Sequence, residues 1–297
     1  MAGLITSTRI SPTPDMLGES PLWDHATGRI YWVDGVSCLI RWHDLKIGTT
    51  GNVKVPSMIG SIGLAGDDML VAGLVDGLYM VDLATGDCRP LYRSDPPDPT
   101  IRFNDGKVDR QGRFLCGSMG VRAEANGELV RIDAAGAHSV LATGIRIANS
   151  LCFSPDGKTM YFSDSLDRLI RAYRYSAADE PLDMPRVFVD TQAWRSGPDG
   201  ATVDADGCVW VALVQAGKIG RFTPKGQLDR LIEAPTDMPS CIAFGGSDLA
   251  TLFVTSIKDS GTGRAVSRHP SGGHVFAIEG LGVTGLPEPR FGSAKGA

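Results

Sequence analysis

The fold is indicated first by a short stretch of sequence, Leu151-Cys-Phe-Ser-Pro-Asp-Gly-Lys-Thr-Met-Tyr-Phe162. It contains two apolar runs on either side of a polar turn that carries Pro, Asp and Gly. Short apolar and aromatic runs are typical of β-strands, and an Asp-Gly turn between two such runs is typical of a hairpin. The stretch therefore predicts two neighbouring antiparallel strands.

The same pattern recurs along the whole chain. The other copies are Pro21–Val33, Ile62–Val71, Gly106–Leu115, Ala201–Val211 and Ile242–Phe253. The six turns begin at residues 24, 65, 109, 154, 204 and 245, which gives a repeat of 41 to 50 residues. A repeat of this length with several strands is the signature of a β-propeller, in which each repeat is one four-stranded blade. We therefore expect an all-β propeller of six four-stranded antiparallel blades.

A third apolar strand follows each hairpin. These strands are expected at Leu39–Trp42, Gly77–Asp82, Glu128–Asp133, Ile170–Tyr175, Ile219–Phe222 and Gly273–Ile278. Little chain remains after the last of them, whereas residues 4–10 precede the first hairpin. We expect residues 4–10 to form the outer strand of the last blade and to close the ring. Residues 1–297 are then a single domain.

The composition excludes several classes of protein. The chain is 42% hydrophobic and 21% charged, and 29 basic against 34 acidic residues give a net charge of −5. Charges spread in this way do not favour nucleic acid or a membrane surface as a partner, and no apolar run reaches the roughly 20 residues of a spanning helix. Residues 1–10 lack the pattern of a secretion signal, so we expect a cytoplasmic protein. The six cysteines include no CxxC pair and are expected to be buried free thiols.

One position in each repeat is expected to face the central channel, because the innermost strand of every blade lines it. Counting back five residues from each turn gives Glu19, Gly60, Asn104, Asn149, Asp199 and Ser240. Polar groups buried in a packed channel need a compensating partner, and a bound cation is the simplest one. Donors that are all oxygens favour a hard ion such as Ca²⁺, Mg²⁺ or Mn²⁺, although Asn or Asp before a strand is also a common turn residue. The five histidines lie off these positions, and we expect them on the surface or in turns.

Five motifs stand in a fixed order between about residue 15 and residue 279. They are Leu17-Gly-Glu-Ser-Pro-Leu-Trp-Asp24, Arg102-Phe-Asn-Asp-Gly-Lys-Val-Asp109, Asn149–Tyr161, Pro198-Asp-Gly-Ala-Thr-Val-Asp204 and Cys241-Ile-Ala-Phe-Gly-Gly246. In content and spacing they resemble the senescence marker protein (regucalcin), gluconolactonase and luciferin-regenerating enzyme family of six-bladed propellers. Within that family the chain looks like a bacterial sugar lactonase.

The resemblance implies a set of site residues. Glu19, Asn149 and Asp199 match the family's ligands for one divalent metal ion in the central channel, which in different members is calcium, zinc, manganese, magnesium or ferrous iron. Arg102 and Asn104 match the residues that contact substrate. The family hydrolyses sugar-acid lactones, so a small lactone is the expected substrate.

Two departures from the family's motifs bear on specificity. Ser20 stands beside Glu19 where the family has glycine. Arg122 stands where some members place a glutamate that touches substrate, with Glu124 nearby. A cationic Arg122 would favour a substrate that bears a carboxylate, unless it is only a solvated loop residue. Trp194, in the loop before Asp199, is expected to line the mouth of the pocket.

The function expected is that of a metal-dependent hydrolase that opens a sugar-acid lactone with a metal-activated water. In this hypothesis Asp199 is both a metal ligand and the general base, while Arg102, Asn104 and Arg122 bind the substrate. Two alternatives stand beside it: an esterase or phosphotriesterase acting on another small molecule, and a noncatalytic propeller that binds a ligand through its metal. A monomer or a small homo-oligomer is expected.

Overall fold

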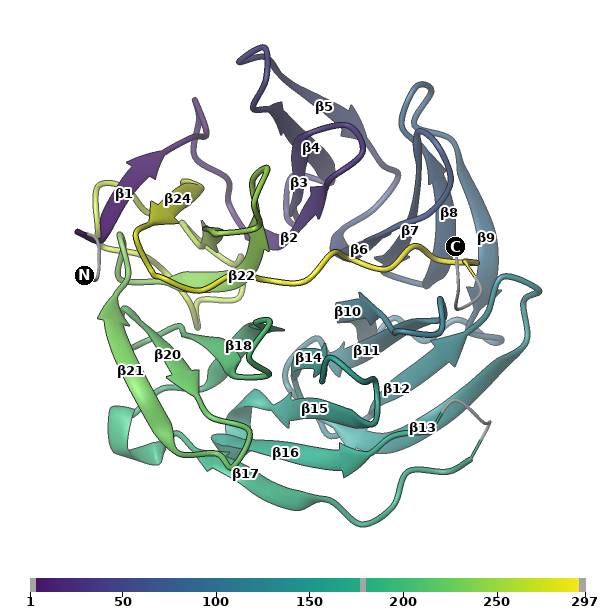
Figure 1. Cartoon of the computed structure of the whole chain (residues 1–297). Helices are drawn as coiled ribbons and strands as arrows, with labels where there is room; N and C mark the ends of the chain where they lie inside the picture. Colours follow the sequence, from purple (N-terminus) through teal and green to yellow (C-terminus); the bar gives the residue numbers. More distant parts are fainter. Residues whose placement is uncertain (1–3, 177–179, 294–297) are drawn as a thin grey trace.

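The computed structural model describes residues 4–176 and 180–293, and the remaining residues of the predicted domain 1–297 lie outside this description. The described residues form six four-stranded antiparallel sheets arranged around a central axis (Figure 1). This arrangement confirms the predicted six-bladed propeller. Among the described residues, the helices are too short and too polar to cross a membrane.

Each blade has the same order of strands from the channel to the outside. The innermost strands are β2 (Gly18–Asp24), β6 (Ile59–Leu64), β10 (Ile101–Val108), β14 (Ala148–Phe153), β18 (Pro198–Val203) and β22 (Pro239–Gly245). The second strands are β3 (Arg29–Asp34), β7 (Met69–Leu74), β11 (Phe114–Gly120), β15 (Thr159–Asp164), β19 (Val209–Leu213) and β23 (Thr251–Ser256). The third strands are β4 (Leu39–Asp44), β8 (Gly77–Asp82), β12 (Gly127–Ile132), β16 (Leu169–Arg174), β20 (Lys218–Phe222) and β24 (Phe276–Glu279). The outer strands are β5 (Thr50–Lys54), β9 (Cys88–Arg93), β13 (His138–Ile145), β17 (Arg186–Asp190), β21 (Leu228–Glu233) and β1 (Thr6–Arg9).

The sixth blade is completed by the beginning of the chain. Strand β1 pairs with β24, with Thr6 opposite Glu279 and Arg9 opposite Phe276. All four residues of β1 are exposed, so this strand contributes backbone hydrogen bonds rather than core packing. It lies within residues 4–10, the stretch for which the sequence predicts the outer strand of the last blade.

The apolar core lies between neighbouring blades rather than at one centre. One cluster joins blades one and two through Val33, Ile40, Ile62 and Leu70, and each of these side chains is at most 1% exposed. The second strands, such as β7 and β19, are buried along nearly their whole length, which explains why their sequences are apolar without strict alternation. The buried apolar side chains are therefore divided among the interfaces between neighbouring blades.

The chain beyond β24 crosses the end of the propeller where the inner strands finish (Figure 1). Its backbone bonds to the sixth and second blades near the ends of their inner strands: Gly285 N donates to Leu249 O at 2.8 Å and Phe291 N to Leu64 O at 2.7 Å. Near the end of β10, Lys107 Nζ lies 2.7 Å from Glu288 Oε1 of this segment. The C-terminal segment thus covers one end of the channel, and the sequence did not indicate this role.

All six cysteines are free, as predicted. Four are buried, whereas Cys38 and Cys88 are only partly so. The expectation that every histidine lies on the surface or in a turn is wrong for His274, which is 7% exposed. Its Nδ1 lies 3.1 Å from Ser11 Oγ, and this contact joins the segment after β1 to the sixth blade. A hydrogen-bond partner inside the fold allows this imidazole to be buried.

Candidate functional site

The channel-facing positions lie near the start of each inner strand, and each lies within or directly before a β-bulge. The register shifts fall between Glu19 and Leu22, Ile59 and Ser61, Phe103 and Gly106, Asn149 and Cys152, Pro198 and Ala201, and Pro239 and Ile242. A bulge bends its strand and changes the direction of the side chain beside it. Because the six inner strands start at the same end of the channel, the bulges bring their polar side chains together there.

Two bulges contain a serine with a left-handed backbone. Ser20 has φ 50° and Ser150 has φ 57°, a conformation that costs a residue other than glycine roughly 1–2 kcal/mol. Both hydroxyls bond to the neighbouring blade: Ile62 N donates to Ser20 Oγ at 3.0 Å, and Ser150 Oγ donates to Asp199 O at 2.6 Å. Ser20 therefore links two blades directly beside Glu19.

A chain of hydrogen bonds crosses three blades at this end of the channel. Arg102 Nη1 donates to Asn104 Oδ1 at 2.8 Å, and Asn104 Nδ2 donates to Asn149 Oδ1 at 3.3 Å. Asn149 Nδ2 then donates to Ser165 Oγ at 2.8 Å, and Ser165 Oγ donates to Pro198 O at 2.8 Å. These bonds fix both amides, so that the Oδ1 atom of Asn149 is left with a free lone pair.

Three carboxyl groups lie beside this chain: Asp199 is buried, and Glu19 and Asp105 are half-buried. Burial raises the pKa of Glu19 well above its ordinary value, and the nearby Asp199 and Asp105 raise it further, against the opposing charge of Arg102. Burial and Asp105 likewise raise the pKa of Asp199. Burial raises the pKa of Asp105 to about 6, while its Oδ2 accepts a hydrogen bond from Leu151 N at 2.8 Å. Burial and mutual repulsion therefore disfavour the ionised forms of Glu19 and Asp199, and a cation beside them would offset this cost.

The donor set fits a hard divalent cation. Within the part of the chain that the structure describes, neither Glu19 nor Asp199 forms an ion pair. Together with Asn149 Oδ1 they offer two carboxylates and one amide oxygen, which are the ligand types of Ca²⁺, Mg²⁺ and Mn²⁺. The described residues contain no group of three or more His, Cys, Asp or Glu placed to hold a metal ion, so the amide is needed to complete three protein ligands.

A cavity of about 240 Å³ opens at this end of the channel. Five of the predicted site residues line it: Glu19, Arg102, Asn104, Asn149 and Asp199. Gly60 and Ser240, the other two channel positions, are not among the residues that line it. A Cβ atom at Gly60 would lie 2.4 Å from the Asn104 carbonyl oxygen, and the Ser240 hydroxyl donates to Gly18 O. These two positions hold inner strands together instead of presenting polar groups.

Two further predicted residues lie outside the cavity lining. Arg122 is exposed in the loop after β11, and its backbone carbonyl accepts a hydrogen bond from Arg264 Nη2. Trp194, expected at the pocket mouth, packs edge-on against Phe222 with ring centroids 5.8 Å apart.

The sequence reasoning missed four residues at or beside the site: Asp105, Ser165, Arg168 and Arg264. Asp105 directly follows Asn104, so the bulge in β10 places two consecutive polar residues near the channel. Arg168 and Arg264 lie in connections between strands, where the repeat pattern gives no equivalent positions. Only their proximity in the fold identifies them.

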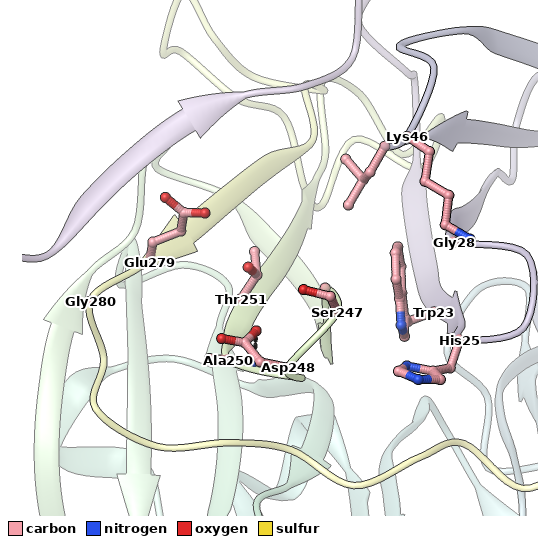
Figure 2. A pocket seen from close by; sticks show the side chains of 12 residues that line it. Trp23, His25, Gly28, Lys46, Ser247, Asp248, Ala250, Thr251, Glu279 and Gly280 are labelled. Carbon is pink, nitrogen blue, oxygen red and sulfur yellow. Dashed lines mark hydrogen bonds between the residues drawn. The ribbon is translucent and has the colours of Figure 1, made fainter.

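A second and larger cavity, of about 750 Å³, lies between the first and sixth blades (Figure 2). Trp23, Lys46, Asp248 and Glu279 are among the residues around it. It lies near the hairpin turns at the opposite end of the inner strands, and none of the predicted site residues lines it. The smaller cavity is therefore the candidate site, because it is lined by the polar cluster of Glu19, Arg102, Asn104, Asn149 and Asp199.

Residues 17–258 match the SMP-30/gluconolactonase/LRE-like region, which covers most of the chain and every residue of the polar cluster. The chain belongs to this family. Membership confirms the resemblance drawn from the sequence motifs, which lie in the same region of the chain.

Two relatives of this SMP-30/gluconolactonase/LRE-like protein carry names of sugar lactonases. The chain is 34% identical to a 6-deoxy-6-sulfogluconolactonase of Pseudomonas putida, over 94% of this chain and 96% of the relative. It is 31% identical to a pentonolactonase of Haloferax volcanii, over 96% of this chain and 98% of the relative.

The fold of this family member is also that of solved structures. The crystal structure of a calcium-binding protein, regucalcin, from Agrobacterium tumefaciens superposes with a TM-score of 0.88. The two chains are 28% identical, and the match covers 97% of each. The similarity therefore extends over all six blades.

Proposed function

We propose that this protein is a sugar-acid lactonase whose reaction depends on one divalent cation held by Glu19, Asn149 and Asp199. The observation that carries the proposal is the meeting of these three groups with Arg102 and Asn104 in a single cavity at one end of the channel. The relatives named as a sulfogluconolactonase and a pentonolactonase support a lactone of a sugar acid as the substrate.

Hydrolysis of a lactone adds water to the carbonyl carbon and breaks the bond to the ring oxygen, which yields a hydroxy acid. When bound, the cation would supply Lewis-acid polarisation of the carbonyl and would favour the ionised forms of Glu19 and Asp199. Asp199 accepts a proton from the attacking water and returns one to the departing ring oxygen, as a general base and then a general acid.

Arg102 and Asn104 bind the substrate in this scheme. The guanidinium of Arg102 is held by Asn104 at 2.8 Å, and it is positively charged beside the carbonyl that gains negative charge in the transition state. Because Asn104 is fixed by the fourth blade and in turn holds Arg102, little reorganisation is needed when the substrate arrives.

The test is a pH-indicator assay on a panel of aldonolactones, with metal-stripped protein and with each divalent ion restored in turn. We expect acid release well above the spontaneous rate. This release should require added metal and should be lost in Asp199→Asn. Asp248→Asn, in the other cavity, serves as the matched control and should keep full activity. Hydrolysis of phosphotriesters or simple esters but not of lactones overturns the proposal, as does metal binding without any turnover.

A further inference from the structure

The cavity above the polar cluster has a positively charged rim. Among the residues that line it, Arg168 and Arg264 come from connections in the fourth and sixth blades, while Arg102 belongs to the cluster below. Among the described residues that line the cavity, Glu19 and Asp199 are the acidic ones, and the proposed cation accounts for both. The two rim arginines therefore have no counter-charge among these described lining residues.

Arg168 is held in place by its backbone and not by its side chain. It follows the short 3-10 helix η1 (Ser165–Asp167) with φ 57°, a left-handed conformation that costs a side-chain-bearing residue roughly 1–2 kcal/mol. The conformation is fixed because Arg168 N donates to Ser165 O at 3.2 Å and Thr191 N donates to Arg168 O at 2.9 Å. The backbone of Arg168 is therefore held at a defined place beside the cavity.

The side chain of Arg168 differs from those of its neighbours. Arg146 and Arg171 in the same blade both pair with Asp167, the latter at 2.7 Å. Arg168 forms no hydrogen bond or ion pair through its guanidinium with any residue in the described ranges. An arginine that lines a cavity while its neighbours are neutralised is available to a ligand.

Arg264 reaches the mouth from the other side. It lies in the connection between β23 and β24, which is folded back on itself by the bridge of Asp259 with Val266 and by the bond from Ser260 N to Ala265 O at 3.0 Å. Its Nη2 donates to the carbonyl of Arg122, in the loop of the third blade. This contact is with a neutral carbonyl, and within residues 4–176 and 180–293 the guanidinium of Arg264 forms no ion pair, so its charge is available at the mouth of the cavity.

We infer that the substrate carries a second, negatively charged group at the end remote from the lactone carbonyl, and that Arg168 and Arg264 bind this group. The inference rests on the proposed function, since it places the lactone at the polar cluster. A sulfonate, a phosphate and a carboxylate share the required chemistry, because the guanidinium group offers several donors to their oxygens. The sequence suggested that Arg122 binds a negatively charged group of the substrate. In this inference Arg264 binds that group instead, and the backbone carbonyl of Arg122 holds Arg264 in place.

The test compares two substrates that differ only at the remote end, glucono-1,5-lactone and 6-phosphoglucono-1,5-lactone. The wild-type protein should show the higher kcat/KM for the phosphorylated lactone. Arg168→Gln and Arg264→Gln should each reduce that value by about 10-fold, mainly through KM, while changing the value for the neutral lactone less than about 3-fold.

Arg195→Gln is the matched control. Arg195 also follows a 3-10 helix, η2 (Gln192–Trp194), with φ 53°, but it is not among the residues that line the cavity. Equal kcat/KM values for the two lactones, unchanged in both rim variants, overturn the inference and leave the lactonase proposal standing.

Binding without turnover separates the two proposals. Calorimetry with 6-phosphogluconate and gluconate measures the contribution of the remote group even if neither lactone is hydrolysed. Tighter binding of 6-phosphogluconate that is lost in Arg168→Gln supports the inference in that case also. Equal binding of the two acids in wild-type protein contradicts it.

Discussion

Asn104 Nδ2 donates a hydrogen bond to Asn149 Oδ1 across 3.3 Å and so joins the inner strands of the third and fourth blades. The same amide accepts a hydrogen bond from Arg102 Nη1 at 2.8 Å. One side chain therefore orients both a proposed metal ligand and a proposed substrate-binding cation. Loss of such a supporting residue typically costs 10- to 100-fold in metal affinity or in activity.

We predict that Asn104→Ala weakens metal binding and lowers kcat/KM together, each by about 10- to 100-fold. Ion titration by calorimetry and the lactone assay measure the two effects. Asn126→Ala is the control, because Asn126 also donates a side-chain hydrogen bond, to Thr100 Oγ1, but lies outside the cavity lining. Normal ion affinity in Asn104→Ala would show that Asn149 needs no support from its neighbour.

Glu19 and Asp199 should differ in how their variants respond to added metal. If Glu19 acts only as a ligand, Glu19→Gln needs at least about 10-fold more metal for half-maximal activity and then recovers much of its kcat. Asp199→Asn should stay inactive at every metal concentration, because the general base is missing. Measurement of activity against metal concentration for both variants distinguishes a residue that only binds metal from the general base. Recovery of Asp199→Asn by excess metal contradicts the assignment of Asp199 as the base.

The propeller and most of the polar cluster could be predicted because they depend on a repeat. Strands, turns and channel positions recur at one offset, so the repeat alone marks the polar channel positions. The family resemblance, not the repeat, selects Glu19, Asn149 and Asp199 among them as metal ligands. Ser240 occupies the same offset, yet its hydroxyl donates to the Gly18 carbonyl and joins the last inner strand to the first. The repeat predicts the position of a residue, whereas its hydrogen-bond partner depends on packing between blades.

Features outside the repeat could not be predicted in this way. Arg168 and Arg264 lie in connections of different length and conformation, and they line one cavity only because the closed ring brings the fourth and sixth blades around it. The C-terminal segment has no apolar periodicity, and it is held by backbone bonds and by single side chains such as Glu288. Such contacts join residues far apart in the sequence, so no local pattern shows them.

Removal of residues 1–10 should destabilise the protein without changing its site. The deletion removes β1, so β24 keeps its hydrogen bonds to β23 but loses those to β1. The sixth blade becomes a three-stranded sheet with an exposed edge. Hydrogen bonds of about 1 kcal/mol each give a loss of a few kcal/mol, or a fall in Tm of roughly 5–10 °C. Thermal unfolding of both proteins measures it. A truncated protein that melts with the full chain would mean that β1 does not stabilise the ring.

The ion pair of Lys107 and Glu288 should stabilise the covered end of the channel. Its side chains are 16% and 9% exposed, so removal of one partner leaves a largely buried charge. We predict that Glu288→Gln lowers the free energy of unfolding by roughly 3 kcal/mol. The double variant Lys107→Met with Glu288→Leu should recover most of this loss. Urea unfolding of the single and double variants measures the coupling, and additive losses would show that the two residues act independently.

His274 should make the stability of the sixth blade sensitive to pH. Burial lowers the pKa of this imidazole below its ordinary value, and the positive charges of Arg9 and Lys258 lower it further. The unfolded chain therefore binds a proton at His274 more readily than the folded chain does. As pH falls through about 6.5, the ordinary pKa of histidine, this difference removes stability.

We predict that between pH 7 and pH 5 the wild-type protein loses more of its free energy of unfolding than His274→Gln does. The glutamine side chain of this variant cannot take up a proton, and its amide can still bond to the Ser11 hydroxyl that His274 contacts. His269→Gln, at an exposed histidine, is the matched control and should keep the wild-type slope. Urea unfolding at several pH values gives the slopes. Equal slopes for wild type and His274→Gln would show that protonation of His274 is not linked to unfolding.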